Sequence, residues 1–178
     1  MIKLVASDLD GTLLHNYQQT VPKEIYDTIK ALHEKGIIFT AASGRQYANI
    51  RRLFAPLGFD IPYIAENGSM CVYKEEILAT GLTPSKTIRH ILDALMEYRK
   101  IYHTGHCILF CKKILITATQ PMNVFIDYME NDMHNIVTYV PDLYAIKEPI
   151  IKAAICDFGG TKNLELLPQK ESGMKSAL

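Results

Sequence analysis

The sequence has no tryptophan, no excess of either charge and only four cysteines in 178 residues. Nineteen basic residues balance nineteen acidic ones, so we expect neither a nucleic acid nor a membrane surface as a partner. The cysteines form no CxxC pair, which argues against a zinc site or a disulfide framework. No apolar run approaches the roughly 20 residues of a membrane helix, and the first residues do not resemble a signal peptide. These absences favour a reduced, cytoplasmic protein.

The first part of the chain alternates short apolar runs with amphipathic segments. Hydrophobic residues make up 48% of the sequence, enough for one core, or for a core and a small second lobe. Strand and helix alternate at the spacing of an α/β fold, which predicts a parallel sheet covered on both faces. The expected strands are 2–6, 37–42 and 62–65, and the expected helices are 20–35 and 45–57.

The pattern changes near residue 81, where a small α+β lobe with an antiparallel sheet is expected to begin. Its order is helix, two strands joined by a tight turn, helix, and two further strands. The predicted helices are 84–100 and 121–131, and the predicted strands are 107–110, 114–118, 136–140 and 152–156. The expected division is therefore a first lobe over 1–82, an inserted lobe over 83–167, and a return to the first lobe over 168–178.

Two aspartates end the first apolar run, in LVASDLDGTLL (4–14). Charges beside a buried strand are costly unless they are paired, so a metal ion, a substrate or both are expected there. Asp8, at the strand end, is suited to in-line attack on phosphorus, with formation of an aspartyl-phosphate. Asp10 can protonate the leaving oxygen and later deprotonate the attacking water. Mg²⁺ held by oxygen ligands would screen the repulsion between carboxylate and phosphate.

A second polar loop, ASGR (42–45), follows the second strand and should lie within reach of the same substrate. Gly11 permits a tight turn whose amide groups point at phosphate oxygens, and the hydroxyls of Thr12 and Ser43 can add hydrogen bonds. Ser43 is equally well explained as a helix N-cap, and the two roles can coexist. A bare DxD also occurs in ordinary turns and in nucleotide-sugar transferases, but its setting between two such strands favours phosphate chemistry.

Three motifs together resemble the haloacid dehalogenase (HAD) superfamily of phosphatases, in its Cof-like branch with a large α/β cap. They are DLDGTLL (8–14), KGIIFTAASGR (35–45) and AENGS (65–69). The resemblance implies a Rossmann-like parallel-sheet core with an inserted α+β cap domain. It further implies that Asp8 is the nucleophile, that Asp10 is the general acid/base, and that both hold Mg²⁺. By the same resemblance Ser43, with Gly44 beside it, belongs to the phosphate-binding loop.

Further residues take their expected roles from this resemblance. Asn67 would lie near the site, or is a plain turn residue. Arg45 would reach the substrate or the cap, or is an exposed arginine at a helix start. The family's third motif is a lysine that screens nucleophile and phosphate where the chain leaves the cap. Lys170 fits that position best and Lys175 is the alternative.

The family's fourth motif, an acidic GDxxND-type loop, does not occur in the sequence. We therefore expect the core to be incomplete at the C-terminus, with apolar surface exposed beside the first strand. The leading hypothesis is Mg²⁺-dependent hydrolysis of a small phosphomonoester, such as a sugar or cofactor phosphate, by a monomer or homodimer. The alternatives are a non-catalytic fragment that binds a phosphorylated ligand or a partner, a phosphoryl transferase or mutase of the same superfamily, and glycosyl transfer at a DxD site.

Overall fold

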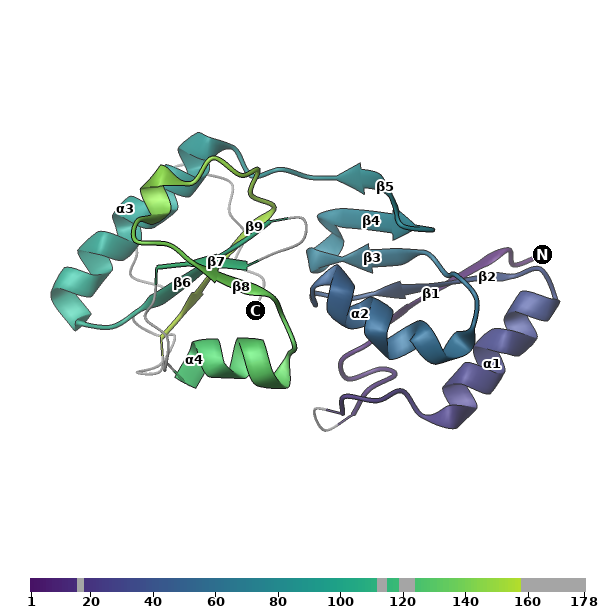
Figure 1. The fold of residues 1–178 in the computed structure, drawn as a ribbon. Helices are drawn as coiled ribbons and strands as arrows, with labels where there is room; N and C mark the ends of the chain where they lie inside the picture. Colours follow the sequence, from purple (N-terminus) through teal and green to yellow (C-terminus); the bar gives the residue numbers. More distant parts are fainter. Residues whose placement is uncertain (16–17, 112–114, 119–123, 158–178) are drawn as a thin grey trace. The chain divides into compact units, whose positions relative to one another are not determined.

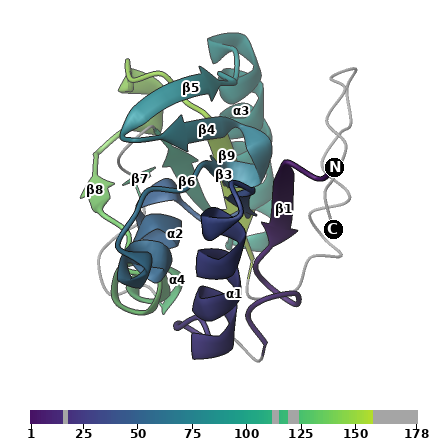
Figure 2. The same ribbon diagram turned by 90° about the vertical axis from the view of Figure 1, so that its right-hand side faces the viewer.

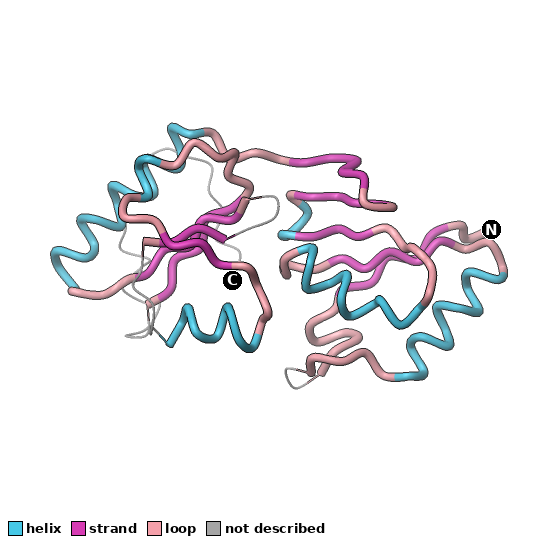
Figure 3. The backbone as a smooth tube through the Cα atoms, viewed as in Figure 1, coloured by secondary structure: helices cyan, strands magenta, loops and turns pink. Residues whose placement is uncertain are grey.

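The structure is a computed structural model that describes residues 1–15, 18–111, 115–118 and 124–157. The chain forms two compact units, each with its own β-sheet (Figures 1 and 3). The first unit contains residues 1–82 together with 133–135. The second contains 83–132 and the residues after 135. The expected return segment, 168–178, lies outside the described residues.

The first unit is built on a five-stranded mixed sheet, in the order β1-β2-β3-β4-β5. The first three strands are parallel, whereas β3–β4 and β4–β5 are antiparallel pairs. The predicted α/β class is confirmed, but the sheet is not purely parallel. After β3 the chain turns back through residues 66–68 and adds two antiparallel strands, β4 and β5, which the sequence did not predict. The strands are β1 (Leu4–Asp8), β2 (Ile38–Ala42), β3 (Tyr63–Ala65), β4 (Met70–Tyr73) and β5 (Glu76–Thr80).

Two helices, α1 (Lys23–Glu34) and α2 (Tyr47–Phe54), pack against this sheet (Figures 1 and 2). They also contact each other, since the Tyr26 hydroxyl donates a hydrogen bond of 2.6 Å to the Leu53 carbonyl. Both helices begin later than predicted. Pro22 stands at the N-cap of α1, and the chain is still extended at Gln46, the N-cap of α2.

Part of the sheet is uncovered in the first unit. Right-handed crossovers along the order β1-β2-β3 put both helices on the same face. Among the described residues β1 pairs with β2 alone, and Leu4 and Ile38 are 54% and 50% exposed. The prediction that the sheet is covered on both faces is therefore wrong for this part of the described chain.

The second unit has a four-stranded sheet in the order β8-β7-β6-β9. The pairs β6–β7 and β6–β9 are antiparallel as predicted, but β7 and β8 are parallel. A parallel return needs a longer connection than a tight turn, and residues 118–136, which include α4 (Val124–Asp127), provide it. The strands are β6 (His106–Phe110), β7 (Leu115–Thr117), β8 (Val137–Tyr139) and β9 (Lys152–Cys156).

The two faces of β6 explain how this sheet is covered. Cys107 and Leu109 belong to the apolar cluster that includes Leu92 of α3 (Ser85–Tyr102). Ile108 belongs to the cluster that includes Ile126 of α4. Alternate residues of one strand thus face different helices, as the two-residue period of a strand requires. None of the helices in the described part of the chain is both long and apolar enough to cross a membrane.

Candidate active site

The carboxyl ends of the three parallel strands bring the predicted loops to one edge of the sheet. Asp8 is aligned with Ala42, and Ala42 is aligned with Ile64. The loops that follow β1, β2 and β3 therefore emerge side by side, at the position where open α/β sheets bind ligands.

The loop after β1 is a tight turn anchored by Leu9 and Leu14, both buried. The Leu9 carbonyl accepts hydrogen bonds from the amides of Thr12, Leu13 and Leu14 at 3.2, 2.9 and 2.8 Å. Gly11 has a φ of +83°, which a residue with a side chain rarely adopts, and its amide donates to the Leu14 carbonyl at 2.8 Å. The apolar anchors hold the turn while the aspartates of the motif stay exposed.

This hydrogen bonding changes the expected role of the turn. The amides of Gly11 and Thr12 both donate within the loop and do not face outward. In this conformation a phosphate contact from the loop needs other donors, such as the exposed hydroxyl of Thr12. The predicted tight turn at Gly11 is present, but the predicted outward direction of these two amides is not.

The loop after β2 closes on itself through Ser43. The Ser43 Oγ accepts a hydrogen bond from the Arg45 amide at 3.1 Å, and the Ser43 amide donates to the Ile64 carbonyl at 2.9 Å. Helix α2 begins only at Tyr47, without a side-chain cap at Gln46. The alternative that Ser43 caps the helix is therefore wrong. Its hydroxyl hydrogen is the group that can donate to a phosphate oxygen.

The loop after β3 is tied to the loop after β2. The Glu66 amide donates to the Arg45 carbonyl at 3.1 Å, and the Asn67 amide donates to the Ser43 carbonyl at 3.2 Å. Asn67 has the left-handed conformation, with a φ of +57°, and lies in the turn that the sequence indicated. Its side-chain amide lies against Gly44, so a Cβ on that glycine would be 2.3 Å from Asn67 Oδ1.

Arg45 differs most from its expected roles, because it is buried and points at Asp10. Its Nε donates to Asp10 Oδ2 at 3.0 Å, and its Nη2 donates to Asp10 Oδ1 at 2.7 Å. Only 7% of the Arg45 side chain is exposed, against 53% for Asp10. The alternative that Arg45 is an exposed residue at a helix start is therefore wrong. Its Nε and Nη2 groups, which were expected to reach the substrate or the cap, bind the Asp10 carboxylate in this structure.

Two residues that the sequence did not single out complete this cluster. Arg45 Nη1 donates to Gln19 Oε1 and to Asn49 Oδ1, both at 3.2 Å. Asn49 lies four residues after Arg45, a spacing that favours contact on a helix and offered a weak signal. Gln19 lies 26 residues earlier in the sequence, and no local pattern indicates that contact.

The donor set fits a hard cation through Asp8. The described residues contain no group of three or more His, Cys, Asp or Glu side chains that could hold a metal ion. Asp8 is exposed at the end of β1, and Mg²⁺ accepts one or two carboxylates with water and substrate oxygens as its other ligands. Both Asp10 carboxylate oxygens bind a guanidinium, so that side chain fits a cation less well. Lys170 and Lys175 lie outside the described residues.

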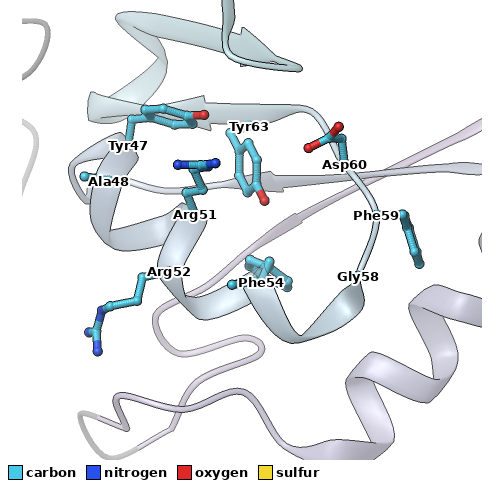
Figure 4. A pocket seen from close by; sticks show the side chains of 10 residues that line it. Tyr47, Ala48, Arg51, Arg52, Phe54, Gly58, Phe59, Asp60 and Tyr63 are labelled. Carbon is cyan, nitrogen blue, oxygen red and sulfur yellow. The ribbon is translucent and has the colours of Figure 1, made fainter.

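A cavity of about 540 Å³ lies elsewhere on the first unit, between α2 and the segment 58–63 (Figure 4). Tyr47, Arg51 and Tyr63 contribute to its wall, and Arg51 forms an ion pair of 2.7 Å with Glu75. Burial raises the pKa of Tyr63 to about 12. Neither Asp8 nor Asp10 lines this cavity, so it is separate from the candidate site.

Comparison with protein families decides what this arrangement is. The model of the haloacid dehalogenase-like hydrolases matches residues 5–167. The chain belongs to this family. The resemblance carried by the three sequence motifs is thereby confirmed, and the match also includes most of the second unit.

Curated relatives of this chain include two named phosphatases. Phosphoglycolate phosphatase 1 of Saccharolobus solfataricus is 39% identical over 77 residues, which is 43% of this chain and 34% of that protein. The 5-amino-6-(5-phospho-D-ribitylamino)uracil phosphatase YbjI of Escherichia coli is 22% identical over 177 residues, which is 99% of this chain and 62% of that protein. The chain thus spans between a third and two thirds of their lengths.

Solved structures agree on the fold of this chain. A haloacid dehalogenase-like hydrolase from Bacteroides thetaiotaomicron superposes with a TM-score of 0.68 at 21% identity, over 86% of this chain and 57% of that one. A haloacid dehalogenase-like hydrolase from B. subtilis gives a TM-score of 0.66 at 21% identity, over 84% of this chain and 59% of that one.

Proposed function

We propose that this chain hydrolyses small phosphomonoesters with Mg²⁺, through an aspartyl-phosphate formed on Asp8. The observation that carries the proposal is the meeting of three polar loops at the carboxyl ends of β1, β2 and β3, with Asp8 exposed at the first. Family membership and the phosphatase names of the relatives support the same reaction class.

The proposed reaction uses this chain's own groups. A carboxylate oxygen of Asp8 attacks phosphorus, the bond from phosphorus to the ester oxygen breaks, and Asp10 gives its proton to the leaving alkoxide. Water then attacks the same phosphorus, the bond to the Asp8 oxygen breaks, and Asp10 takes a proton from the water. The Ser43 hydroxyl hydrogen is free to donate to a phosphate oxygen in both steps.

The proposed magnesium ligand is the Asp8 carboxylate. When bound, Mg²⁺ supplies positive charge that offsets the repulsion between a carboxylate and a phosphate dianion. Asp10 was expected to share this role, but its paired guanidinium makes its side chain the weaker candidate. The proposed division of labour leaves Asp8 to bind and attack, and Asp10 to carry protons.

The proposed substrates are sugar or cofactor phosphates of small size. Two relatives are named for phosphoglycolate and for 5-amino-6-(5-phospho-D-ribitylamino)uracil, which are both small phosphate monoesters. We further propose that the second unit acts as a cap that selects the substrate. The four cysteines are free, which supports a reducing compartment such as the cytoplasm.

The test is release of inorganic phosphate from 4-nitrophenyl phosphate by the 178-residue chain. We expect release with Mg²⁺, none with EDTA, and none from Asp8→Asn. Asp60→Asn is the matched control, because Asp60 is an exposed aspartate of the same unit that lies outside the three loops. Release that survives Asp8→Asn, or no release by the folded wild-type chain, would contradict the proposal.

A further inference from the structure

The contact between Arg45 and Asp10 joins a buried cation to an exposed anion. Two parallel hydrogen bonds, of 3.0 and 2.7 Å, connect the guanidinium to both carboxylate oxygens. Such paired bonds fix the plane of the carboxylate as well as its distance. Asp10 lies on a turn at the surface, where a short side chain without a partner samples several rotamers.

The guanidinium itself is held rigidly. Its Nη1 donates to Gln19 and Asn49, its side chain is 7% exposed, and the Arg45 amide and carbonyl both form hydrogen bonds within the loops. Arginine cannot release its proton in a protein, so this cation is permanent. The direction of Asp10 is therefore set by a group that is itself fixed from several sides.

We infer that Arg45 is the positioning residue for the Asp10 carboxylate, with Gln19 and Asn49 holding the guanidinium in place. The inference rests on the proposed function, in which Asp10 moves the protons. Arg45 acts through Asp10 and does not touch the reacting phosphate. A misdirected carboxylate lowers the rate of proton transfer, because general acid–base catalysis requires hydrogen-bond reach to the reacting oxygen.

The paired arrangement leaves Asp10 able to carry a proton. Each carboxylate oxygen has two lone-pair directions, and the guanidinium bonds occupy one on each oxygen. The exposed half of Asp10 faces solvent, where a leaving oxygen or a water can approach. Arg45 thus orients the carboxylate on one side and leaves the other side open.

The first test uses the leaving group as a probe. A nitrophenolate leaves without a proton, whereas the alkoxide of phosphoglycolate requires one. In Arg45→Lys, which keeps the charge but loses the paired hydrogen bonds, we expect the single-turnover release of glycolate from phosphoglycolate, which reports formation of the aspartyl-phosphate, to slow about 10- to 100-fold. The loss should be less than about threefold for the single-turnover release of nitrophenolate from 4-nitrophenyl phosphate, because this step needs no proton from Asp10, and the half-saturating concentration of both esters should change by less than about threefold. Hydrolysis of the intermediate, which Asp10 assists for both esters, does not enter these single-turnover rates.

Controls separate positioning from general damage. Arg51→Lys alters an exposed arginine of α2 that pairs with exposed Glu75, and it should leave both rates unchanged. Gln19→Ala removes one support of the guanidinium and should give the same pattern as Arg45→Lys at smaller size. In an Asp10→Asn background, Arg45→Lys should add less than about a twofold loss. Equal losses of the two single-turnover rates, or a full additional loss in that background, would overturn the inference.

A second measurement does not depend on turnover. Asp10→Asn leaves the buried guanidinium without its counter-charge, whereas in Arg45→Met no buried charge remains to be left unpaired. We expect Asp10→Asn to lower Tm by about 2–4 °C more in the wild-type background than in Arg45→Met. Equal shifts would overturn the inference even in a chain without activity. Absent phosphate release together with unequal shifts would reject the proposed function and keep the positioning contact.

Discussion

Gly44 and Asn67 are in such close contact that a Cβ on residue 44 would lie 2.3 Å from Asn67 Oδ1. Gly44 belongs to the loop after β2 and Asn67 to the loop after β3. The Asn67 amide also donates to the Ser43 carbonyl, so the two loops are joined by a hydrogen bond and by close packing. The glycine permits this approach, because a Cβ at residue 44 fits only if the Asn67 side chain moves.

Gly44→Ala should therefore damage the site more than the fold. The added methyl group displaces the Asn67 side chain, which is short and exposed and moves at little cost. We expect kcat/KM for 4-nitrophenyl phosphate to fall about tenfold while the free energy of unfolding changes by less than about 1 kcal/mol. Gly81→Ala is the control, since a Cβ there meets nothing within 4 Å. An unchanged kcat/KM in Gly44→Ala would show that Asn67 has no role in turnover.

Leu92→Ala should destabilise the second unit strongly. Leu92 of α3 is 3% exposed and packs in the cluster with Cys107 and Leu109 of β6. Loss of its buried methyl groups and the cavity left behind should cost about 2–5 kcal/mol in urea unfolding. Met96, one turn later on α3, is 45% exposed, and Met96→Ala should cost less than about 1 kcal/mol. Similar costs for the two substitutions would contradict the packing of α3 described above.

The sequence indicated the site because the chemistry and the strands are local signals. An apolar run that ends in Asp8, and a second that ends in Ser43, indicate two neighbouring strand ends without long-range information. Which way Arg45 points depends instead on Asp10 and Gln19, which are 35 and 26 residues away. Neither helical periodicity nor composition reports such contacts.

The hairpin of β4 and β5 was missed for a different reason. Its turn places Lys74 and Glu75 at φ values of +50° and +66°. Two-residue hairpin turns of this kind are recognised in sequences by Asn-Gly or Asp-Gly, because those residues adopt positive φ easily. Lys-Glu carries no such signal. The strand pairing that surrounds the turn holds it in a conformation that the residues themselves do not favour.

Alkaline pH should destabilise the fold through buried thiols. Burial raises the pKa of Cys107 from an ordinary value of 9.0 to about 11. Between pH 9 and 11 the thiol ionises in the unfolded chain but keeps its proton in the folded one. The contribution of this thiol to the free energy of unfolding is therefore complete below pH 9 and is lost as the pH rises. We expect the free energy of unfolding to fall by up to about 1.4 kcal/mol per pH unit in this window.

Denaturant unfolding at several pH values checks this expectation. Cys107→Ala should lower stability at every pH but give a shallower slope above pH 9, since one buried titrating group is gone. Leu109→Ala, in the same apolar cluster, should also lower stability but leave the slope unchanged, since it removes no thiol. A slope in Cys107→Ala as steep as in the wild type would show that this thiol does not titrate as proposed.

The most direct test of the central claim is to trap the covalent intermediate. The chain is mixed with 4-nitrophenyl phosphate and Mg²⁺, quenched in acid, reduced with borohydride and mapped by mass spectrometry. Reduction of an aspartyl-phosphate converts that aspartate to homoserine, and the account predicts homoserine at residue 8 alone. The amount of homoserine at residue 8 should increase in Asp10→Asn, because that variant lacks the base for hydrolysis of the intermediate. Homoserine should be absent in Asp8→Asn. Phosphate release without homoserine at residue 8, or with homoserine elsewhere, would contradict the account.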